Sequence, residues 1–290
     1  MILFPRSSDT HLTSLPKSST DGLICFSSPF DETAVDFLVN EVKVPMLKIA
    51  SFETVDTKLL AKAAQTGLPI IMSNGMMDFR ELLEAVTVLR KNGLQDLTLL
   101  QCNSGYPATF EDANLSTMAV MKEMFDCKVG VSDHTLFVDT KDYKNPKPHI
   151  TPLEAVKRGA KVVEVHVMRS REESKVLMEK GLGGFDWPFS RELHELKKMV
   201  DMIRDFENGG NPQYESEEEK QQAMAQENSS GQVTWRYTSS GIGYWDYGNG
   251  FGWAPPNPKR DKIIQGLLVS QSTKNKLMIG SKGRTIFIPR

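Results

Sequence analysis

The chain has 290 residues, of which 39% are hydrophobic and 25% charged, so it can build one large domain or one domain with extensions. Its 35 Lys and Arg nearly balance its 37 Asp and Glu, and the formal charge of -2 argues against a nucleic-acid or anionic-membrane partner. Its apolar runs fall far short of the roughly 20 residues that span a bilayer. The three cysteines show no metal-type spacing, and the N-terminus lacks a signal-peptide pattern. We therefore expect a cytoplasmic protein whose thiols are reduced and mostly buried.

Composition divides the chain into three parts. Residues 1–21 are rich in Ser, Thr and Pro, which predicts a disordered leader. Residues 22–206 alternate strand-like and helix-like segments, which predicts the folded domain. Residues 207–290 begin with a polar stretch that is typical of disorder and continue with an aromatic, glycine-rich stretch. That stretch could form short strands, including a sugar-contacting surface, or a loosely folded tail.

Six apolar segments of the central part predict strands, and each is followed by a helix-like pattern. The strand segments read GLICFSS, PMLKIAS, PIIMSNG, LTLLQCNS, KVGVSDH and KVVEVHV. The helices are expected near residues 31–43, 56–65, 78–91, 113–125, 152–160 and 190–206. Asp31 is expected to cap the first helix, Asp78 and Glu81 to form a capping box, and Pro152 to lie near a first helical position.

This alternation predicts a parallel sheet covered by helices, either an open doubly wound sheet or a (β/α)8 barrel. The absence of a glycine-rich phosphate loop after any strand weakens the nucleotide-binding form of the open sheet. A full barrel takes about 250 residues. Because only residues 22–206 alternate, we expect a barrel that lacks two βα units.

Polar residues stand where the predicted strands end, which is the edge that carries chemistry in parallel α/β folds. His134 and His166 are 32 residues apart and end successive strands. Both imidazoles are therefore expected on one rim, where a divalent metal could bind between them. The alternative is that each His merely hydrogen-bonds a loop carbonyl.

Two further charged residues lie inside apolar runs. Lys48 interrupts PMLKIAS, and buried lysines are nearly always paired. We expect it to bind a phosphate or carboxylate with the hydroxyl of Ser51, the alternative being a salt bridge to Glu53 or Glu164. Glu164 interrupts the last strand and requires a polar partner of its own.

Several of these segments resemble the sialic acid synthase family: FDETAVDFLVNEVKVPMLKIASFE, PIIMSNGM, LLQCNSGYPATFEDANL, VGVSDHT and EVH with GGFD. KIASFE, YPATFEDANL and GGFDWPFS are most similar to its pseudaminic acid synthase branch, and the resemblance covers Leu23–Phe206. It implies a (β/α)8 TIM-type barrel and a transferase of carbohydrate biosynthesis. Such an enzyme, of the N-acylneuraminate synthase type, condenses phosphoenolpyruvate with an N-acylated amino sugar and releases phosphate. It also implies a divalent metal, Mn²⁺ or Mg²⁺, and a possible homodimer.

The resemblance assigns roles residue by residue. The metal ligands match His134 and His166. The phosphoenolpyruvate contacts match Lys48, Ser51 and Ser132, and more weakly Ser104. The residues implied to handle protons or to face the sugar are Glu53, Tyr106, Glu164 and Asp186. The catalytic set is thus Glu53, Lys48 and Asp186.

The chain also departs from the family pattern. The leader contains neither of the motifs of the first two barrel strands, and Val165 stands where a lysine is usual. One insertion follows His134, and another, around Arg171–Lys180, lengthens the loop before Gly183. The small antifreeze-like C-terminal domain is not recognisable. Two alternatives therefore stay open. One is a catalytically impaired homologue that binds a sugar or a protein, and the other is a different phosphoenolpyruvate-using barrel.

Overall fold

A computed structural model describes residues 24–108, 113–138 and 149–212, together with five short strands nearer the ends of the chain. The chain forms two compact units. The first consists of Met1–Leu99, Glu123–Cys127 and Gly231–Arg290. The second consists of Leu100–Lys122 and Lys128–Ser230. The predicted domain boundaries at residues 21 and 206 stay predictions.

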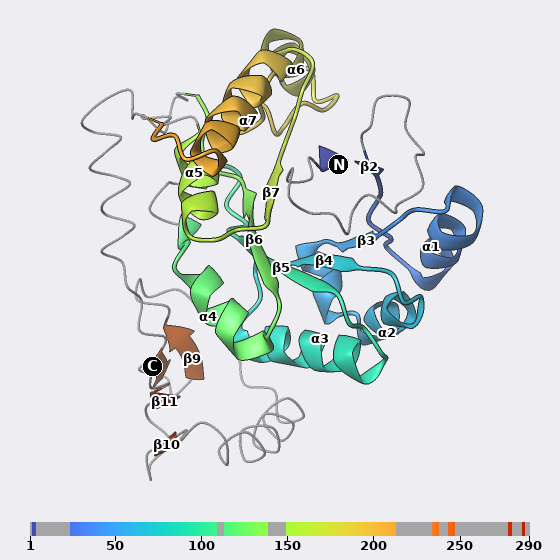
Figure 1. Ribbon diagram of the computed structural model, residues 1–290. Coiled ribbons are helices and arrows are strands. Elements are labelled where there is room, and N and C mark those ends of the chain that lie inside the picture. Colours follow the sequence, from blue (N-terminus) through green and yellow to red (C-terminus); the bar gives the residue numbers. More distant parts are fainter. Residues whose placement is uncertain are drawn as a thin grey trace. The chain divides into compact units, whose positions relative to one another are not determined.

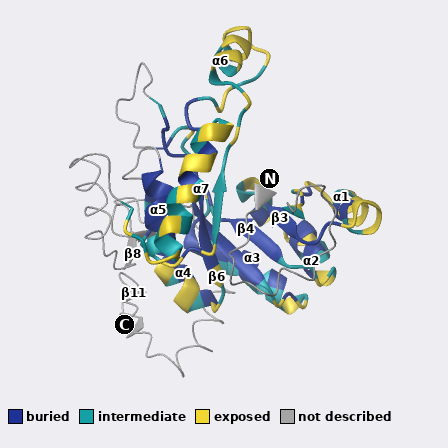
Figure 2. Ribbon diagram, turned by 45° about the horizontal axis from the view of Figure 1, so that its top comes forward, coloured by how far each residue is buried: buried dark blue, intermediate teal, exposed yellow. Residues whose placement is uncertain are grey.

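The central sheet has five strands in chain order, β3-β4-β5-β6-β7 (Figure 1). They are β3 (Leu47–Ile49), β4 (Ile70–Ser73), β5 (Leu97–Cys102), β6 (Lys128–Asp133) and β7 (Val162–Val165). β3 pairs with β4 in parallel, and β6 pairs with β7 in parallel. Every residue of β3, β4 and β5 is buried (Figure 2), as expected for strands covered on both faces. The expected α/β fold with a parallel sheet is confirmed.

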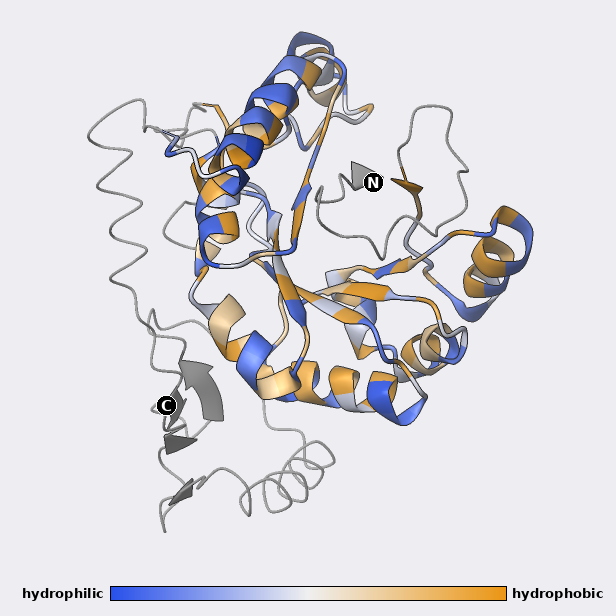
Figure 3. Ribbon diagram, viewed as in Figure 1, coloured by the Kyte–Doolittle hydropathy of each residue, from blue (hydrophilic) through white to orange (hydrophobic). Residues whose placement is uncertain are grey.

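Helices of the first unit begin where the sequence predicts them. They are α1 (Glu32–Asp36), a π-helical stretch (Phe37–Val42), a 3-10 turn (Ser51–Val55), α2 (Thr57–Gln65) and α3 (Phe79–Lys91). The side chain of Asp31 accepts the N–H of Ala34, and Asp78 and Glu81 form the expected capping box. Figure 3 shows hydrophobic and hydrophilic residues alternating along α3, whose apolar face is buried.

Helices of the second unit differ more from expectation. They include α5 (Ile150–Lys157), α6 (Arg171–Glu179) and α7 (Leu193–Glu207), and α4 (Thr117–Phe125) runs from this unit into the first. α4 and α7 begin three or more residues later than predicted, and Pro152 is the third residue of α5 rather than the first. The residues around Arg171–Lys180, expected as an insertion in a loop, form the helix α6, which Ser170 caps by accepting the N–H of Glu173.

The first predicted strand is also wrong in its pairing. β2 (Ile24–Cys25) pairs antiparallel with β1 (Ile2–Leu3), which lies in the part of the leader expected to be unstructured. Ser27 continues this segment toward the parallel sheet by a parallel bridge to Leu47. Whether two βα units are missing stays a prediction.

The C-terminal part contains four short strands in the order β10-β11-β8-β9. They are β8 (Thr234–Tyr237), β9 (Gly243–Asp246), β10 (Met278–Ile279) and β11 (Ile286–Phe287). β8 and β9 pair antiparallel with Trp235 opposite Trp245, which agrees with the short strands considered for the aromatic stretch. The polar stretch expected to be disordered and the insertion after His134 fall largely outside the described residues.

The three thiols are free, but they are not mostly buried. Cys102 is buried, Cys127 is partly buried and Cys25 is exposed. Among the helices that the structure describes, none has the length and apolar character that crossing a membrane would require.

Candidate active site

The ends of β6 and β7 bring the two predicted metal ligands together. Ser132 lies opposite Glu164 in the parallel register, and Asp133 opposite Val165, so His134 and His166 follow at the same level. Their ring centroids are 5.1 Å apart and the ring planes meet at 70°. The prediction that both imidazoles share one rim is confirmed.

Each imidazole is held through its Nδ1 atom. His134 Nδ1 lies 2.7 Å from the carbonyl oxygen of Asn103, and His166 Nδ1 lies 2.9 Å from Asp186 Oδ2. Because both partners are acceptors, Nδ1 is the donor in each contact, and in the neutral ring Nε2 then keeps its lone pair. Metal-binding histidines typically show this arrangement, with one ring nitrogen bonded to a carbonyl or carboxylate. The loop-carbonyl alternative describes His134 but not His166, whose partner is a carboxylate.

The donor chemistry of the pair would suit two ligands of a divalent metal, and the metal itself stays a prediction. Among residues 24–108, 113–138 and 149–212, no group of three or more His, Cys, Asp or Glu side chains is placed to hold an ion. A metal at His134 and His166 would therefore take further ligands from water or from a substrate oxygen. Open positions of this kind are what a catalytic rather than a structural metal needs.

Aromatic side chains surround the two imidazoles. The ring of Tyr106 lies 4.4 Å from that of His134, and the ring of the fully buried Phe189 lies 5.0 Å from that of His166. Tyr106 is half exposed, and its partial burial raises its pKa to about 12, to which Cys102, Asp186 and Glu164 also contribute. Tyr106 therefore keeps its proton at neutral pH and can donate a hydrogen bond.

The neighbours of His134 favour its protonated form. Burial lowers the pKa of His134, but the Cys102 thiol, with Sγ 3.7 Å from Nδ1, and the Asn103 carbonyl raise it by more. The net pKa is above the ordinary value of histidine. A proton would thus compete with a metal for this imidazole as the pH falls.

Glu164 has the partner that its place in an apolar strand requires. The hydroxyl of Ser132 donates to Glu164 Oε1 over 2.6 Å, and Ser132 is buried.

Ser104, two residues before Tyr106, has a buried hydroxyl oxygen with no hydrogen-bond partner within the described part of the chain. Such a hydroxyl is available to a ligand.

The first unit presents its own group of predicted site residues, at the end of β3. Lys48 is buried, and its Nζ donates to the carbonyl of Ile49 over 3.1 Å. The 3-10 turn that follows carries Ser51, whose Oγ accepts the N–H of Gly75, and Glu53. Glu53 Oε2 is buried and has no hydrogen-bond partner among the residues described. A buried carboxylate oxygen without a partner is costly, so a ligand is expected to contact it.

Sequence reasoning missed the residues that hold these groups in place. Buried Arg191 pairs with Asp133 over 2.6 Å, and its backbone N–H donates to the carbonyl of His166. It thereby ties the end of β6 to the residue after β7. No spacing or motif singles out Arg191, and the Asn103 contact is made by a backbone atom that carries no sequence signal.

The imidazole pair and its aromatic neighbours thus lie at the ends of two strands of a parallel α/β sheet, and known proteins share this architecture. The family model of the NeuB family matches residues 6–211, so the chain belongs to this family. It is 38% identical over 179 residues to pseudaminic acid synthase of Helicobacter pylori, covering 62% of this chain and 46% of that protein. It is 35% identical over 205 residues to N,N'-diacetyllegionaminic acid synthase of Legionella pneumophila, covering 69% and 52% respectively.

Solved structures support the same fold. A sialic acid synthetase from Leptospira borgpetersenii, crystallised with citrate, matches with a TM-score of 0.52 and 27% identity. The match covers 87% of this chain and 66% of that one. The fold is therefore of the TIM-barrel type, as predicted. The chain spans about half the length of the curated relatives it matches.

Proposed function

We propose that the chain acts as a nonulosonic acid synthase, which condenses phosphoenolpyruvate with an N-acylated amino sugar and releases phosphate. The observation that carries the proposal is the pair His134 and His166, each oriented through Nδ1. Membership of the NeuB family supports it. The pseudaminic acid synthase branch is the form that the motif resemblance favours.

In the proposed reaction, C3 of phosphoenolpyruvate attacks the aldehyde carbon of the open-chain sugar. Water then adds at C2, and the resulting tetrahedral carbon expels phosphate to leave a 2-keto acid. When bound, Mn²⁺ or Mg²⁺ would supply Lewis-acid polarisation of the aldehyde oxygen. His134 and His166 would hold that ion through Nε2.

The remaining residues bind substrates or handle protons. The resemblance assigns the phosphoenolpyruvate contacts to Lys48 and Ser51 in the first unit and to Ser132 and Ser104 in the second. The Lys48 ammonium would neutralise an anionic group, and the unpartnered Ser104 hydroxyl would donate to one. Glu53 would move the proton at the attacking end, because one of its buried oxygens has no partner.

Three side chains are left for the sugar. The Tyr106 hydroxyl, protonated because its pKa is about 12, would donate to a sugar oxygen. Glu164 would face the sugar. Asp186 would have two roles, because it would contact the sugar and also hold the His166 ring through Nδ1.

The test is phosphate release from purified protein in the presence of Mn²⁺, phosphoenolpyruvate and an N-acylated hexosamine. N-acetylmannosamine and the diacetamido sugar of the pseudaminate route would be compared. Release should require both sugar and metal and should vanish in His134→Ala. His194→Ala is the matched control, because His194 lies exposed on α7. Release that ignores the sugar, or that survives His134→Ala, would contradict the proposal.

A second function, binding without turnover, is supported by Val165, which stands where the family usually has a lysine. It predicts saturable sugar binding in calorimetry while phosphate release stays at background. The resemblance also supports a homodimer, which light scattering on the eluted protein would test.

A further inference from the structure

The contact between Asp186 and His166 depends on a segment that has no helix or strand of its own. Asp186 lies within residues 183–190, here called the Asp186 segment, and its side chain is 52% exposed. Its carboxylate nevertheless lies 2.9 Å from His166 Nδ1. An exposed carboxylate on a loop keeps one direction only if the backbone around it is fixed, since solvent otherwise competes for its contacts.

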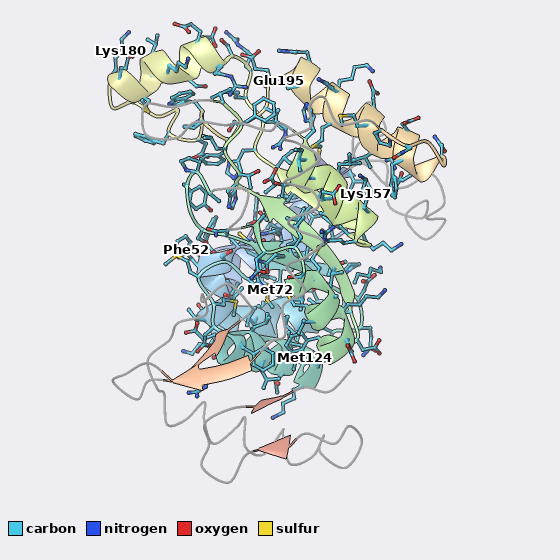
Figure 4. The ribbon with its side chains drawn as sticks, turned by 90° about the vertical axis from the view of Figure 1, so that its left-hand side faces the viewer. Phe52, Met72, Met124, Lys157, Lys180 and Glu195 are labelled. Atoms are coloured by element: carbon cyan, nitrogen blue, oxygen red, sulfur yellow. The ribbon has the colours of Figure 1, made fainter. Side chains whose placement is uncertain are left out.

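Arg171, the first residue of α6, supplies that fixation on the C-terminal side of Asp186. Its Nη1 donates to the carbonyls of Trp187 over 2.8 Å and of Ser190 over 3.0 Å. Its Nη2 reaches Glu195 Oε2 at 2.5 Å, and the Arg171 side chain is only 13% exposed. Figure 4 labels Glu195 on α7 and Lys180, which directly follows α6. One guanidinium thus joins the Asp186 segment to α7.

The rest of α6 holds the segment on both sides of Asp186. Gly184 packs so closely that an added Cβ would lie 2.1 Å from the Ser174 carbonyl oxygen. The indole of Trp187 donates to Met178 Sδ over 3.2 Å, and Lys175 Nζ lies 4.8 Å from the centre of the Trp187 ring. Glycine before Asp186 and tryptophan after it therefore both contact one helix.

We propose that Arg171 is a positioning residue for the metal pair: by fixing the Asp186 segment it holds the Asp186 carboxylate on His166 Nδ1 and so turns Nε2 toward the ion. The inference rests on the proposed function for the role of His166. The inference gives α6 a role in positioning the Asp186 segment, although the sequence pattern suggests an inserted loop at this place.

The first test is a double-mutant cycle that compares Mn²⁺ affinities. Free Mn²⁺ is measured from its electron paramagnetic resonance signal, so the test does not depend on turnover. Arg171→Ala should weaken binding about 10-fold, the lower end of the effect of removing a contact behind a metal ligand. Adding Arg171→Ala to Asp186→Asn should cost no more than Asp186→Asn alone, because the arginine acts through that carboxylate. Additive losses would overturn the inference.

Two variants keep the test independent of folding. Arg169→Ala removes an exposed arginine that pairs with Glu173, and it should leave Mn²⁺ affinity unchanged. Arg171→Lys keeps the charge but cannot reach two carbonyls and a carboxylate together, so it should weaken Mn²⁺ binding while the protein stays folded. Full affinity in folded Arg171→Lys would overturn the inference.

The second test needs no metal. Nitrogen-15 chemical shifts of the neutral His166 ring should show the tautomer protonated at Nδ1 in the parent protein and a mixture of the Nδ1 and Nε2 tautomers in Arg171→Lys. An unchanged ring in the variant would overturn the positioning role. A parent protein that fails to bind Mn²⁺ but shows this change in the ring would contradict the metal assignment and leave the role of Arg171 supported.

Discussion

Arg191 carries its charge into the interior of the second unit, where its side chain is 1% exposed. Nη2 lies 2.6 Å from Asp133 Oδ2, while Nε and Nη1 have no hydrogen-bond partner within the described residues. Asp133 in turn accepts from the backbone and hydroxyl of Thr135. The Asp133 carboxylate therefore fixes both neighbours of His134, because it pairs with Arg191 and also accepts from Thr135.

Removing one partner of this ion pair should destabilise the fold, because the buried charge of Arg191 is then left without a counter-charge. We expect Asp133→Asn to lower the free energy of unfolding by about 3–5 kcal/mol, measured by urea denaturation. Asp201→Asn removes the partner of Lys197 in an exposed ion pair of α7 and should cost no more than about 1 kcal/mol. Equal costs for the two variants would mean that the buried pair does not hold the strand ends.

Burial also decides thiol chemistry. Burial raises the pKa of Cys127 to about 11, so its thiol carries little thiolate at neutral pH. Iodoacetamide should therefore label exposed Cys25 well before Cys127, as followed by mass spectrometry of the peptides. Comparable labelling rates would show that Cys127 is not shielded in solution.

At the level of elements, capping residues and apolar runs in the sequence predicted helix starts and strands, because these signals lie within the segments themselves. Asp31 and Asp78 cap the helices that their positions indicate, and short apolar runs form β3 to β7. The two histidines could be paired in advance because parallel register places equivalent strand ends together. The position of α6 could not, because the helix has no buried residue and its ties to the Asp186 segment are long-range.

The same distinction explains the errors at the N-terminus. The apolar run at residues 23–27 has the composition of a sheet strand, yet β2 within it pairs with Ile2–Leu3, and Ser27 makes a bridge to Leu47 of the parallel sheet. Composition indicates that a segment can pair, and tertiary contacts decide with what. Arg191 and Arg171 were missed for a related reason, since their partners lie far away in sequence.

The capping box of α3 offers a test at this scale. Asp78→Ala removes the acceptor for the N–H of Glu81, and we expect a loss of about 0.5–2 kcal/mol in unfolding free energy. Asp78→Ser keeps an acceptor at the same position and should recover most of that loss. If both variants lose equally, the carboxylate of buried Asp78 contributes through other contacts than the cap.

For the whole molecule, the predicted site residues fall in both compact units. Lys48, Ser51 and Glu53 belong to the first unit, and the two histidines to the second. Both candidate metal ligands thus come from one unit, and neither is near its partner in the unfolded chain. An ion that needs both imidazoles binds the folded state and must stabilise it.

This linkage gives a prediction that requires no substrate. At free Mn²⁺ of about 100 times the dissociation constant, binding adds about 2.7 kcal/mol to stability, which raises the unfolding temperature of a domain of this size by roughly 5–10 °C. Calorimetry should show the shift in the parent protein and in His194→Ala, whose changed residue lies exposed on α7. His134→Ala and His166→Ala should each lose it, because one imidazole and water hold the ion far more weakly than two imidazoles. A shift that persists in both of these variants would place the ion elsewhere in the chain and remove the main support for metal-assisted condensation at this pair.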